Sequence, residues 1–373
     1  MKEVFVVSDN VFTSLGRTTR QNFEEALAGK DGIKFQQQTD LFPAPFWASL
    51  LPRNEIDSSF SGEPVNYTHF EKICIQSIEE ASSKAQIDLT DKKTLLILST
   101  TKGNVELLHN NQFNEARVYL HESARIIQKY FQLKHFPLVV SNACISGVVA
   151  LNCASDMLQG NKYENIIVCG ADVVSEFTIS GFESFKALSD GPCKPFDANR
   201  NGTSLGEAAA TVILSTKHTS KLKLLSGSSS NDANHISGPS RNGHGLYVAI
   251  QKTLTKNKNP KIDFISAHGT GTIFNDEMES KAFNLAGLQH VPLNSYKGLF
   301  GHTFGAAGVL EAAMTLESMR SNTLIPSKGF HAQSDAVQLM LITEAKSAEL
   351  NTCLKTASGF GGCNAAVLFE KIN

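Results

Sequence analysis

The chain has no CxxC pair among its seven cysteines and no cluster of cysteine and histidine at the spacing of zinc ligands. An odd number of cysteines without a pairing pattern favours free thiols and a reducing compartment. Nowhere do about 18 apolar residues follow one another, the length that a membrane helix needs. Only the four apolar residues Val4 to Val7 follow the charged start, too few for a secretory signal. We therefore expect a cytoplasmic protein without a membrane span.

An excess of charge of either sign is absent as well. The 34 Lys and Arg residues nearly balance the 36 Asp and Glu residues, which leaves a net charge of −2. No global field therefore points to nucleic acid or to an anionic membrane, and an acidic partner must be met by a local basic patch. Low-complexity segments are also missing, and 373 residues can bury a substantial core.

Short β-branched runs alternate with segments of helical length, which is typical of α/β proteins. The predicted strands are 93–99, 138–140, 166–168, 210–214, 261–266 and 367–369. The predicted helices are 67–85, 115–131, 145–158 and 305–319. Between residues 216 and 231, Lys, Ser and Gly interrupt the hydrophobic pattern, and we place a boundary there between halves 1–220 and 221–373. Each half has a reactive side chain, Cys144 or His302, just before a helix rich in small residues, which hints at a duplication.

Cys144 lies at the turn between the predicted strand 138–140 and the predicted helix 145–158. A free thiol has a pKa of about 8.5 and is mostly protonated at neutral pH, so a nucleophilic cysteine needs local positive potential. The unpaired N–H groups of a helix N-terminus supply some of it. The other six cysteines are expected to be buried apolar residues.

Two histidines stand in loops of glycine and threonine far along the chain from Cys144. His268 opens the run His-Gly-Thr-Gly-Thr after the predicted strand 261–266, and His302 stands in Gly-His-Thr-Phe-Gly. Glycines let the backbone turn tightly beside a substrate. A cysteine that is joined in the fold by histidines from distant parts of the sequence is typical of covalent catalysis. A third glycine-rich turn, 358–364, offers N–H groups that suit an oxyanion hole together with the Cys144 N–H.

These motifs together resemble the β-ketoacyl-acyl carrier protein synthases, the condensing enzymes of the thiolase superfamily, in the branch with a Cys-His-His site. The resemblance covers most of the chain and rests on ordered motifs at 143–147, 195–200, 232–235, 268–272, 301–308 and 359–362. The stretch 275–279 is more similar to type II polyketide and aryl-polyene synthases than to housekeeping fatty-acid synthases. The resemblance implies a five-layer αβαβα sandwich of two similar halves.

Decarboxylative Claisen condensation is the chemistry that the resemblance implies, without a metal or an organic cofactor. Cys144 would accept an acyl chain from acyl carrier protein as a thioester, and malonyl-carrier protein would then lose CO2 and attack it. His268 and His302 would stabilise the enolate. Neutral imidazoles suit this task because they donate hydrogen bonds without carrying a full charge.

Further site residues are carried over from the same motifs. Lys297, a fourth candidate catalytic residue, and Glu311 would polarise and orient the neighbourhood of His302, the second histidine. Phe360 would gate the pocket and, with Cys144, offer an N–H group to the oxyanion. Besides Glu311, the candidates for oxyanion binding and substrate positioning are Phe360, Gly361, Thr270 and Thr272. Asp197 and Arg200 would brace a loop.

Acyl- and malonyl-loaded acyl carrier protein is the partner that the resemblance implies, with a second, identical or related subunit paired at a sheet edge near the nucleophile. The basic residues Arg125, Lys129 and Lys134 are candidates for a docking patch, although a solvated helix face explains them equally well. Two other functions remain open. One is a chain-length-factor-like subunit that binds carrier protein and condenses nothing, and the other is a thiolase or hydrolase, for which Cys363 would be the second reactive cysteine.

Overall fold

Ten strands form the main β-sheet of the computed structural model, which describes residues 2–37, 41–109, 112–334 and 337–372. Their order across the sheet is β11-β10-β14-β15-β9-β1-β8-β6-β4-β5. They are β1 (Phe5–Phe12), β4 (Thr94–Ser99), β5 (Leu138–Val140), β6 (Asn165–Asp172), β8 (Ala208–Ser215), β9 (Leu222–Asn231), β10 (Phe264–Ser266), β11 (Leu293–Asn294), β14 (Thr352–Gly359) and β15 (Cys363–Lys371). A small three-stranded sheet contains β2 (Lys34–Gln36), β3 (Phe46–Ser49) and β7 (Leu205–Gly206). A two-stranded sheet contains β12 (Thr323–Leu324) and β13 (Lys346–Ser347).

The helices alternate with these strands along the chain. They are α1 (Thr19–Leu27), α2 (Arg53–Ser59), α3 (His69–Ala85), α4 (Leu120–Tyr130), α5 (Ser146–Gln159), α6 (Glu176–Ser184), α7 (His244–Lys256), α8 (Ile273–Leu285), α9 (Lys297–Phe300) and α10 (Ala307–Ser321). Short 3₁₀ turns add η1 (Pro64–Asn66), η2 (Val105–His109), η3 (Glu115–Val118) and η4 (Phe304–Ala306). No helix in this described part of the chain is both long and apolar enough to cross a bilayer.

The same strand pattern occurs twice within the main sheet. In the first half, β1 and β6 flank β8 in antiparallel pairs, and β4 and β5 continue the sheet in parallel. In the second half, β9 and β14 flank β15 in antiparallel pairs, and β10 and β11 continue in parallel. The two sets meet where Phe5 of β1 pairs with Lys223 of β9. The outermost strands, β5 and β11, therefore occupy equivalent places, and they precede Cys144 and His302 respectively.

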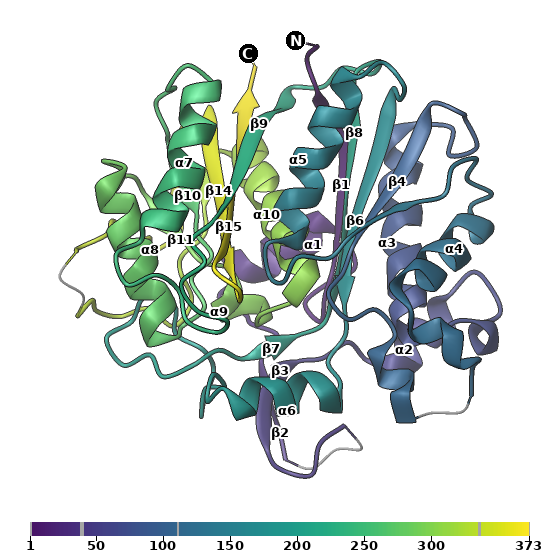
Figure 1. Cartoon of the computed structure of the whole chain (residues 1–373), viewed down its shortest axis with the longest axis horizontal. Helices are drawn as coiled ribbons and strands as arrows, with labels where there is room; N and C mark the ends of the chain where they lie inside the picture. The colour runs from purple at the N-terminus through teal and green to yellow at the C-terminus, as the bar shows by residue number, and fades with distance from the viewer. Residues whose placement is uncertain (1, 38–40, 110–111, 335–336, 373) are drawn as a thin grey trace.

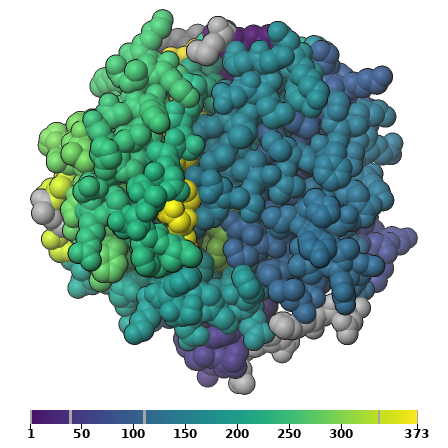
Figure 2. Space-filling view, viewed as in Figure 1, coloured from purple at the N-terminus to yellow at the C-terminus, as the bar shows by residue number. Residues whose placement is uncertain are grey.

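Helices α5 and α10 form the central layer of a five-layer sandwich. Both contact strands of the two halves, whereas α3 and α4 cover the outer face of the first half and α7 and α8 that of the second (Figure 1). Figure 2 shows the blue N-terminal and the green C-terminal parts of the chain side by side across this face. The largest apolar cluster lies between the layers, and α10 is buried from Ala307 to Met319. Burial on every side explains why α10 has almost no polar face.

Two glycines bring the first turns of the central helices into backbone contact. A Cβ atom at Gly147 of α5 would lie 2.6 Å from the Val309 nitrogen, and one at Gly308 of α10 would lie 2.5 Å from the Val148 nitrogen. Real Cβ atoms do not approach other atoms so closely, so any side chain here would push the helices apart. The small residues noted in the sequence thus set the distance between the segments that carry Cys144 and His302.

Each expected segment contains the predicted kind of element, but the bounds differ. The predicted helix 115–131 is a 3₁₀ turn at 115–118 followed by α4 from Leu120, and the predicted strand 261–266 begins only at Phe264.

The predicted strands did not include residues 222–231, which form β9, a central strand between β15 and β1. Gly227 reflects crowding by α5 and β15. A Cβ atom at Gly227 would lie 2.0 Å from the Asn152 side-chain oxygen and 2.3 Å from the Ala366 carbonyl oxygen. Close packing at Gly227, together with the exposure of Ser229 and Asn231, accounts for the weak hydrophobic pattern.

Candidate active site

A strained turn presents Cys144 between β5 and α5. Ala143 has φ of +44°, in the left-handed region that costs a residue with a side chain about 1 kcal/mol or more. The Ser146 hydroxyl braces the turn, since it accepts from the Asn142 N–H at 2.7 Å and donates to the Ala143 carbonyl at 2.6 Å. The thiol is thereby held two residues before α5, where the helix N-terminus supplies positive potential.

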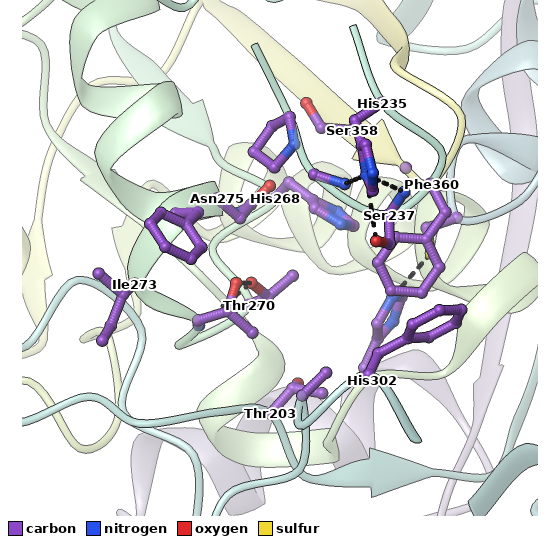
Figure 3. Close-up of a pocket in the computed structure, with 18 of the residues that line it drawn as sticks. Thr203, His235, Ser237, His268, Thr270, Ile273, Asn275, His302, Ser358 and Phe360 are labelled. Carbon is purple, nitrogen blue, oxygen red and sulfur yellow. Dashed lines mark hydrogen bonds between the residues drawn. The ribbon is translucent and has the colours of Figure 1, made fainter. Parts of the chain in front are cut away.

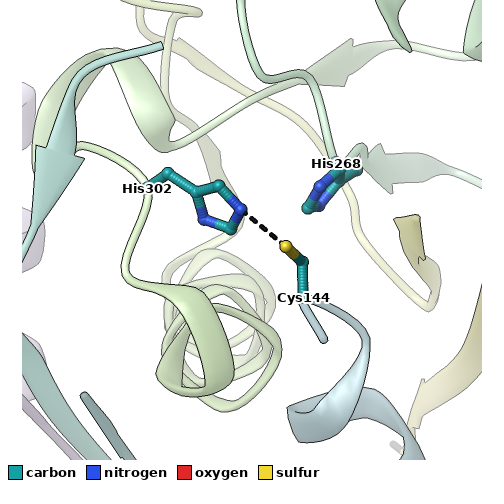
Figure 4. Close-up of side chains that lie close together, drawn as sticks. All are labelled: Cys144, His268 and His302. Carbon is teal, nitrogen blue, oxygen red and sulfur yellow. Dashed lines mark hydrogen bonds between the residues drawn. The ribbon is translucent and has the colours of Figure 1, made fainter. Parts of the chain in front are cut away.

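His302 contacts the thiol directly. Its Nε2 atom lies 3.0 Å from Cys144 Sγ (Figure 4). The backbone is held by β7, because the His302 N–H donates to the Ser204 carbonyl at 2.7 Å and the Gly206 N–H donates to the His302 carbonyl at 3.0 Å. Nδ1 accepts a hydrogen bond from the Phe304 N–H at 3.3 Å. A backbone N–H can only donate, so this contact assigns the imidazole proton to Nε2, which faces the sulfur.

His268 completes the cluster from the loop after β10. The rings of His268 and His302 lie 5.3 Å apart between centroids, and the ligand atoms of both imidazoles and the thiol all lie within 4.8 Å of one another. Two carboxylates of α8 hold the loop. Glu279 accepts from the N–H groups of His268 and Gly269 at 2.9 and 2.7 Å, and Asp276 accepts from the Thr270 N–H at 2.9 Å.

Lys297 supports His268 rather than His302. Its Nζ atom lies 3.2 Å from His268 Nδ1 and donates to the His268 carbonyl at 2.7 Å. Glu311 Oε1 lies 2.6 Å from the same ammonium, and Glu311 is not among the described residues that line the cavity. The expected neighbourhood was that of His302, whereas the direct contacts of Lys297 are with His268, and Lys297 acts on His302 only through its charge. Because the ammonium donates to Nδ1, the proton of the neutral His268 ring lies on Nε2, as in His302.

Burial keeps the three reacting groups neutral. Desolvation, followed by repulsion from Lys297, lowers the pKa of both His268 and His302 well below 6.5. Desolvation also raises the pKa of the Cys144 thiol to about 12. At neutral pH the site thus holds a thiol and two uncharged N–H donors. That arrangement suits a reaction in which negative charge develops only when substrate is bound.

A cavity of about 550 Å³ opens onto the cluster (Figure 3). Phe182, Phe185 and Phe360 form an aromatic wall, with ring centroids 5.7 Å apart for Phe182 and Phe360 and 5.3 Å apart for Phe185 and Phe360. Thr270 and Thr272 line the opposite side, and their hydroxyls lie 2.8 Å apart. The cavity thus combines an aromatic wall with hydroxyl, amide and imidazole groups, which is typical of a site for an organic substrate.

Gly361 does not belong to this lining. Its N–H donates to the Ile236 carbonyl at 2.7 Å. Gly359 lies instead against the nucleophile, because a Cβ atom there would stand 3.1 Å from the Cys144 nitrogen. A glycine at 359 therefore leaves room beside the Cys144 N–H, whereas Gly361 allows the turn itself with φ of +84°.

The basic residues proposed for docking do not line the cavity. Arg125 and Lys129 lie on α4, which ends at Tyr130, so Lys134 follows the helix. Arg125 is paired with Glu122, which further weakens the patch. Lys186, two residues after α6, is the lysine among the described lining residues.

A soft cation such as Zn²⁺ takes thiolate and imidazole ligands, and the three ligand atoms lie close enough to bind one. Metal ligation needs an unprotonated nitrogen facing the ion. Contacts from Lys297 and the Phe304 N–H keep the protons on the Nε2 atoms, so binding would require a change of tautomer in both rings.

Stability should fall as the pH drops below about 6.5, because unfolded histidines bind protons near that value while folded His268 and His302 do so only at much lower pH. Each ring contributes a slope of about 1.4 kcal/mol per pH unit between its two pKa values. Urea unfolding between about pH 7.5 and about pH 5.5 measures this slope. The slope of the unfolding free energy with pH should be shallower in the His268→Asn and His302→Asn variants. An unchanged slope in both variants would contradict the lowered pKa values of the two folded histidines.

Several residues of the site had not been singled out from the sequence. Asp276 and Glu279 lie three residues apart on α8 and face the His268 loop, a spacing that marks one helix face. Phe182 packs at 6.1 Å between ring centroids against His302. Lys355 is fully buried in β14 and contacts Glu311. A charged residue inside an apolar strand was the signal available for Lys355.

Comparisons with known proteins agree with this geometry. Residues 1–220 match the family described as beta-ketoacyl synthase, N-terminal domain, and residues 223–331 match the corresponding C-terminal domain. A putative mitochondrial 3-oxoacyl-[acyl-carrier-protein] synthase of Schizosaccharomyces pombe is 26% identical over 100% of this chain and 99% of its own length.

Solved structures show the same fold. A chain in the complex of a ketosynthase with its chain length factor from Xenorhabdus doucetiae superposes with a TM-score of 0.88, at 22% identity over 100% of this chain and 98% of that one. A type II polyketide acyl-carrier protein in complex with its ketosynthase contains a chain with a TM-score of 0.86, at 19% identity over 100% of both chains. The protein belongs to the β-ketoacyl synthase family of condensing enzymes and has its thiolase-like fold.

Proposed function

We propose that this enzyme condenses an acyl group carried on Cys144 with malonyl-acyl carrier protein to give 3-oxoacyl-acyl carrier protein, in fatty-acid or polyketide biosynthesis. The observation that carries the proposal is the floor of the cavity. There, one thiol and two imidazoles that burial keeps uncharged lie together, with one ligand atom of each within 4.8 Å of the others.

The first half-reaction transfers the acyl chain to the enzyme. Cys144 Sγ bonds to the carbonyl carbon of the acyl thioester, the bond from that carbon to the carrier sulfur breaks, and the leaving sulfur takes up the proton that Cys144 loses. His302 Nε2–H, 3.0 Å from Sγ, stabilises the sulfur as its charge rises. Because the pKa of the free thiol is about 12, ionisation is expected to accompany substrate binding.

The second half-reaction forms the carbon–carbon bond. The bond to the malonyl carboxylate breaks, CO2 leaves, and the electron pair enters an enolate whose oxygen accepts from His268 and His302. The enolate carbon then bonds to the acyl carbon on Cys144, and the thiolate leaves and takes a proton from water. The N–H groups of Cys144 and Phe360 are proposed to bind the intermediate oxyanion, for which Gly359 leaves space.

Acylation should occur at Cys144 alone. After incubation with acyl-loaded carrier protein, the intact mass of the wild-type enzyme should increase by one acyl group. Cys144→Ala should gain none and should lose at least about 10⁴-fold in product formation, since no second path supplies a covalent intermediate. Cys363→Ala is the matched control and should acylate normally.

The rival functions give different masses and products in the same experiment. A chain-length-factor-like subunit would bind carrier protein without gaining mass, and a hydrolase would gain it and then release free acid. A thiolase would depend on Cys363 as well. Full product from Cys144→Ala would contradict the nucleophile assignment.

The surroundings of the site support proposals on assembly and compartment. Strand β5 is the edge of the main sheet, and the side chains of Leu138 and Phe136 are 39% and 53% exposed, so we propose that an identical or related subunit pairs along it. The seven cysteines are free thiols, which supports a reducing cytoplasm. The two sets of five strands support a division into halves 1–220 and 221–373.

A further inference from the structure

Lys355 is a fully buried lysine in the middle of strand β14. Its side chain has no exposed surface, and β14 packs between β10 and β15. Removing an ammonium from water costs several kcal/mol after relaxation, and apolar residues of similar volume often replace buried ion pairs without loss of stability. A lysine at this place therefore calls for a reason other than stability.

The Lys355 ammonium contacts the backbone that delivers His268. Lys355 lies opposite Ser266 in the parallel pair of β14 and β10. Its Nζ atom donates to the carbonyls of Ser266 at 3.3 Å, Ala267 at 3.2 Å and Thr356 at 2.6 Å. Ser266 and Ala267 are the two residues before His268. The ammonium thus binds the end of β10, where the chain turns toward the cavity.

The same ammonium also reaches the His268 ring through two further residues. Nζ lies 2.5 Å from Glu311 Oε2, and the other oxygen of that carboxylate, Oε1, lies 2.6 Å from Lys297 Nζ. Lys297 in turn contacts His268 Nδ1 at 3.2 Å. Lys355 therefore supports His268 by two routes, one through its backbone and one through its ring.

Lys297 and Lys355 share one carboxylate in this row, behind His268. Burial lowers the pKa of Lys355, and the attraction of Glu311 opposes that shift. Asp276 and Glu279 lie on the other side of the loop, and burial raises the pKa of both, that of Glu279 to about 7. Positive charge held on this row, away from bulk water, favours a negative enolate that accepts from the His268 ring.

We propose that Lys355 is a positioning residue for decarboxylation. Its ammonium holds the His268 N–H donor in place and favours the enolate through Glu311 and Lys297. The inference rests on the proposed condensing function. The contacts of Lys355 lead to His268 and not to Cys144 or His302, although its charge also acts on the His302 ring. We therefore expect it to affect decarboxylation more than the acylation of Cys144.

The test compares two rates in Lys355→Met and Lys355→Gln. Methionine preserves the volume and leaves one lysine on one carboxylate, whereas glutamine keeps a donor for the carbonyls but loses the charge. Decarboxylation of malonyl-carrier protein should slow by about tenfold to a hundredfold, the usual cost of removing a residue that orients a reacting group. The loss should appear in kcat, with KM and the rate of Cys144 acylation within about twofold of wild type.

Lys371→Met is the matched control, because Lys371 also donates to a backbone carbonyl, that of Met319, far from His268 in the fold. It should leave both rates unchanged. Equal losses of acylation and decarboxylation in both Lys355 variants, or no loss in either rate, would overturn the inference. Failure of the wild-type enzyme to acylate or to decarboxylate would instead overturn the proposed function.

Discussion

Replacing His268 with alanine is expected to slow the decarboxylation of malonyl-carrier protein by about 10²- to 10³-fold, the cost of removing one donor from an oxyanion site. The reason is that His268 offers one of two N–H donors to the enolate oxygen. Acylation of Cys144 should stay within about twofold of wild type, because His302, and not His268, contacts the sulfur. The release of CO2 and the mass of the acyl-enzyme, measured separately, check the two halves of this prediction.

His290→Ala is a suitable control for that experiment, since His290 is exposed and lies away from the cavity lining. It should leave both rates unchanged. A His268→Ala enzyme that loses acylation and decarboxylation in equal measure would show that the ring acts on the thiol or on the fold, which contradicts the separate roles of the two histidines.

Replacing Gly308 with valine is expected to impair folding and catalysis together. Its Cβ atom would lie 2.5 Å from the Val148 nitrogen, so α5 and α10 must separate. Overpacking of this kind costs about 1–3 kcal/mol of unfolding free energy or more. Because Cys144 precedes α5 and His302 precedes α10, a shift of about 1 Å between the helices should lower condensation by about a hundredfold. Urea unfolding and the rate of product formation measure the two effects.

Gly181→Ala provides the comparison for Gly308→Val, because a Cβ atom at Gly181 in α6 would meet no atom within 4 Å. Alanine is the better helix former, so this control should be neutral or slightly stabilising. If Gly308→Val retained full stability and activity, the glycine contact would not set the spacing of the catalytic segments.

The reactive groups of the site were predictable because their signals are local. The turn before a helix identified Cys144, and glycine-rich loops after strands identified His268 and His302, without knowledge of long-range packing. The alternation of β-branched runs and helical segments likewise identified an α/β fold, since these patterns follow from the geometry of single elements.

The supporting contacts were not predictable in the same way, because they depend on strand order. Lys297 is nearer to His302 than to His268 along the chain, yet β10 and β11 are parallel neighbours, which brings Lys297 to His268. Lys355 reaches the site through the pairing of β14 with β10. Strand β9 was missed because contacts with α5 and β15 require small residues at Gly227. Tertiary packing overrode the local pattern in each case.

The condensing function of the site is tested most directly by following the acyl group on Cys144 after malonyl-carrier protein is added to the isolated acyl-enzyme. Cys144 should lose its acyl group, CO2 should be released, and 3-oxoacyl-carrier protein should appear in equal amounts. An acyl group that remains on Cys144, or that leaves as free acid without a new carbon–carbon bond, would contradict the claim that the thiol and the two imidazoles form a condensing site.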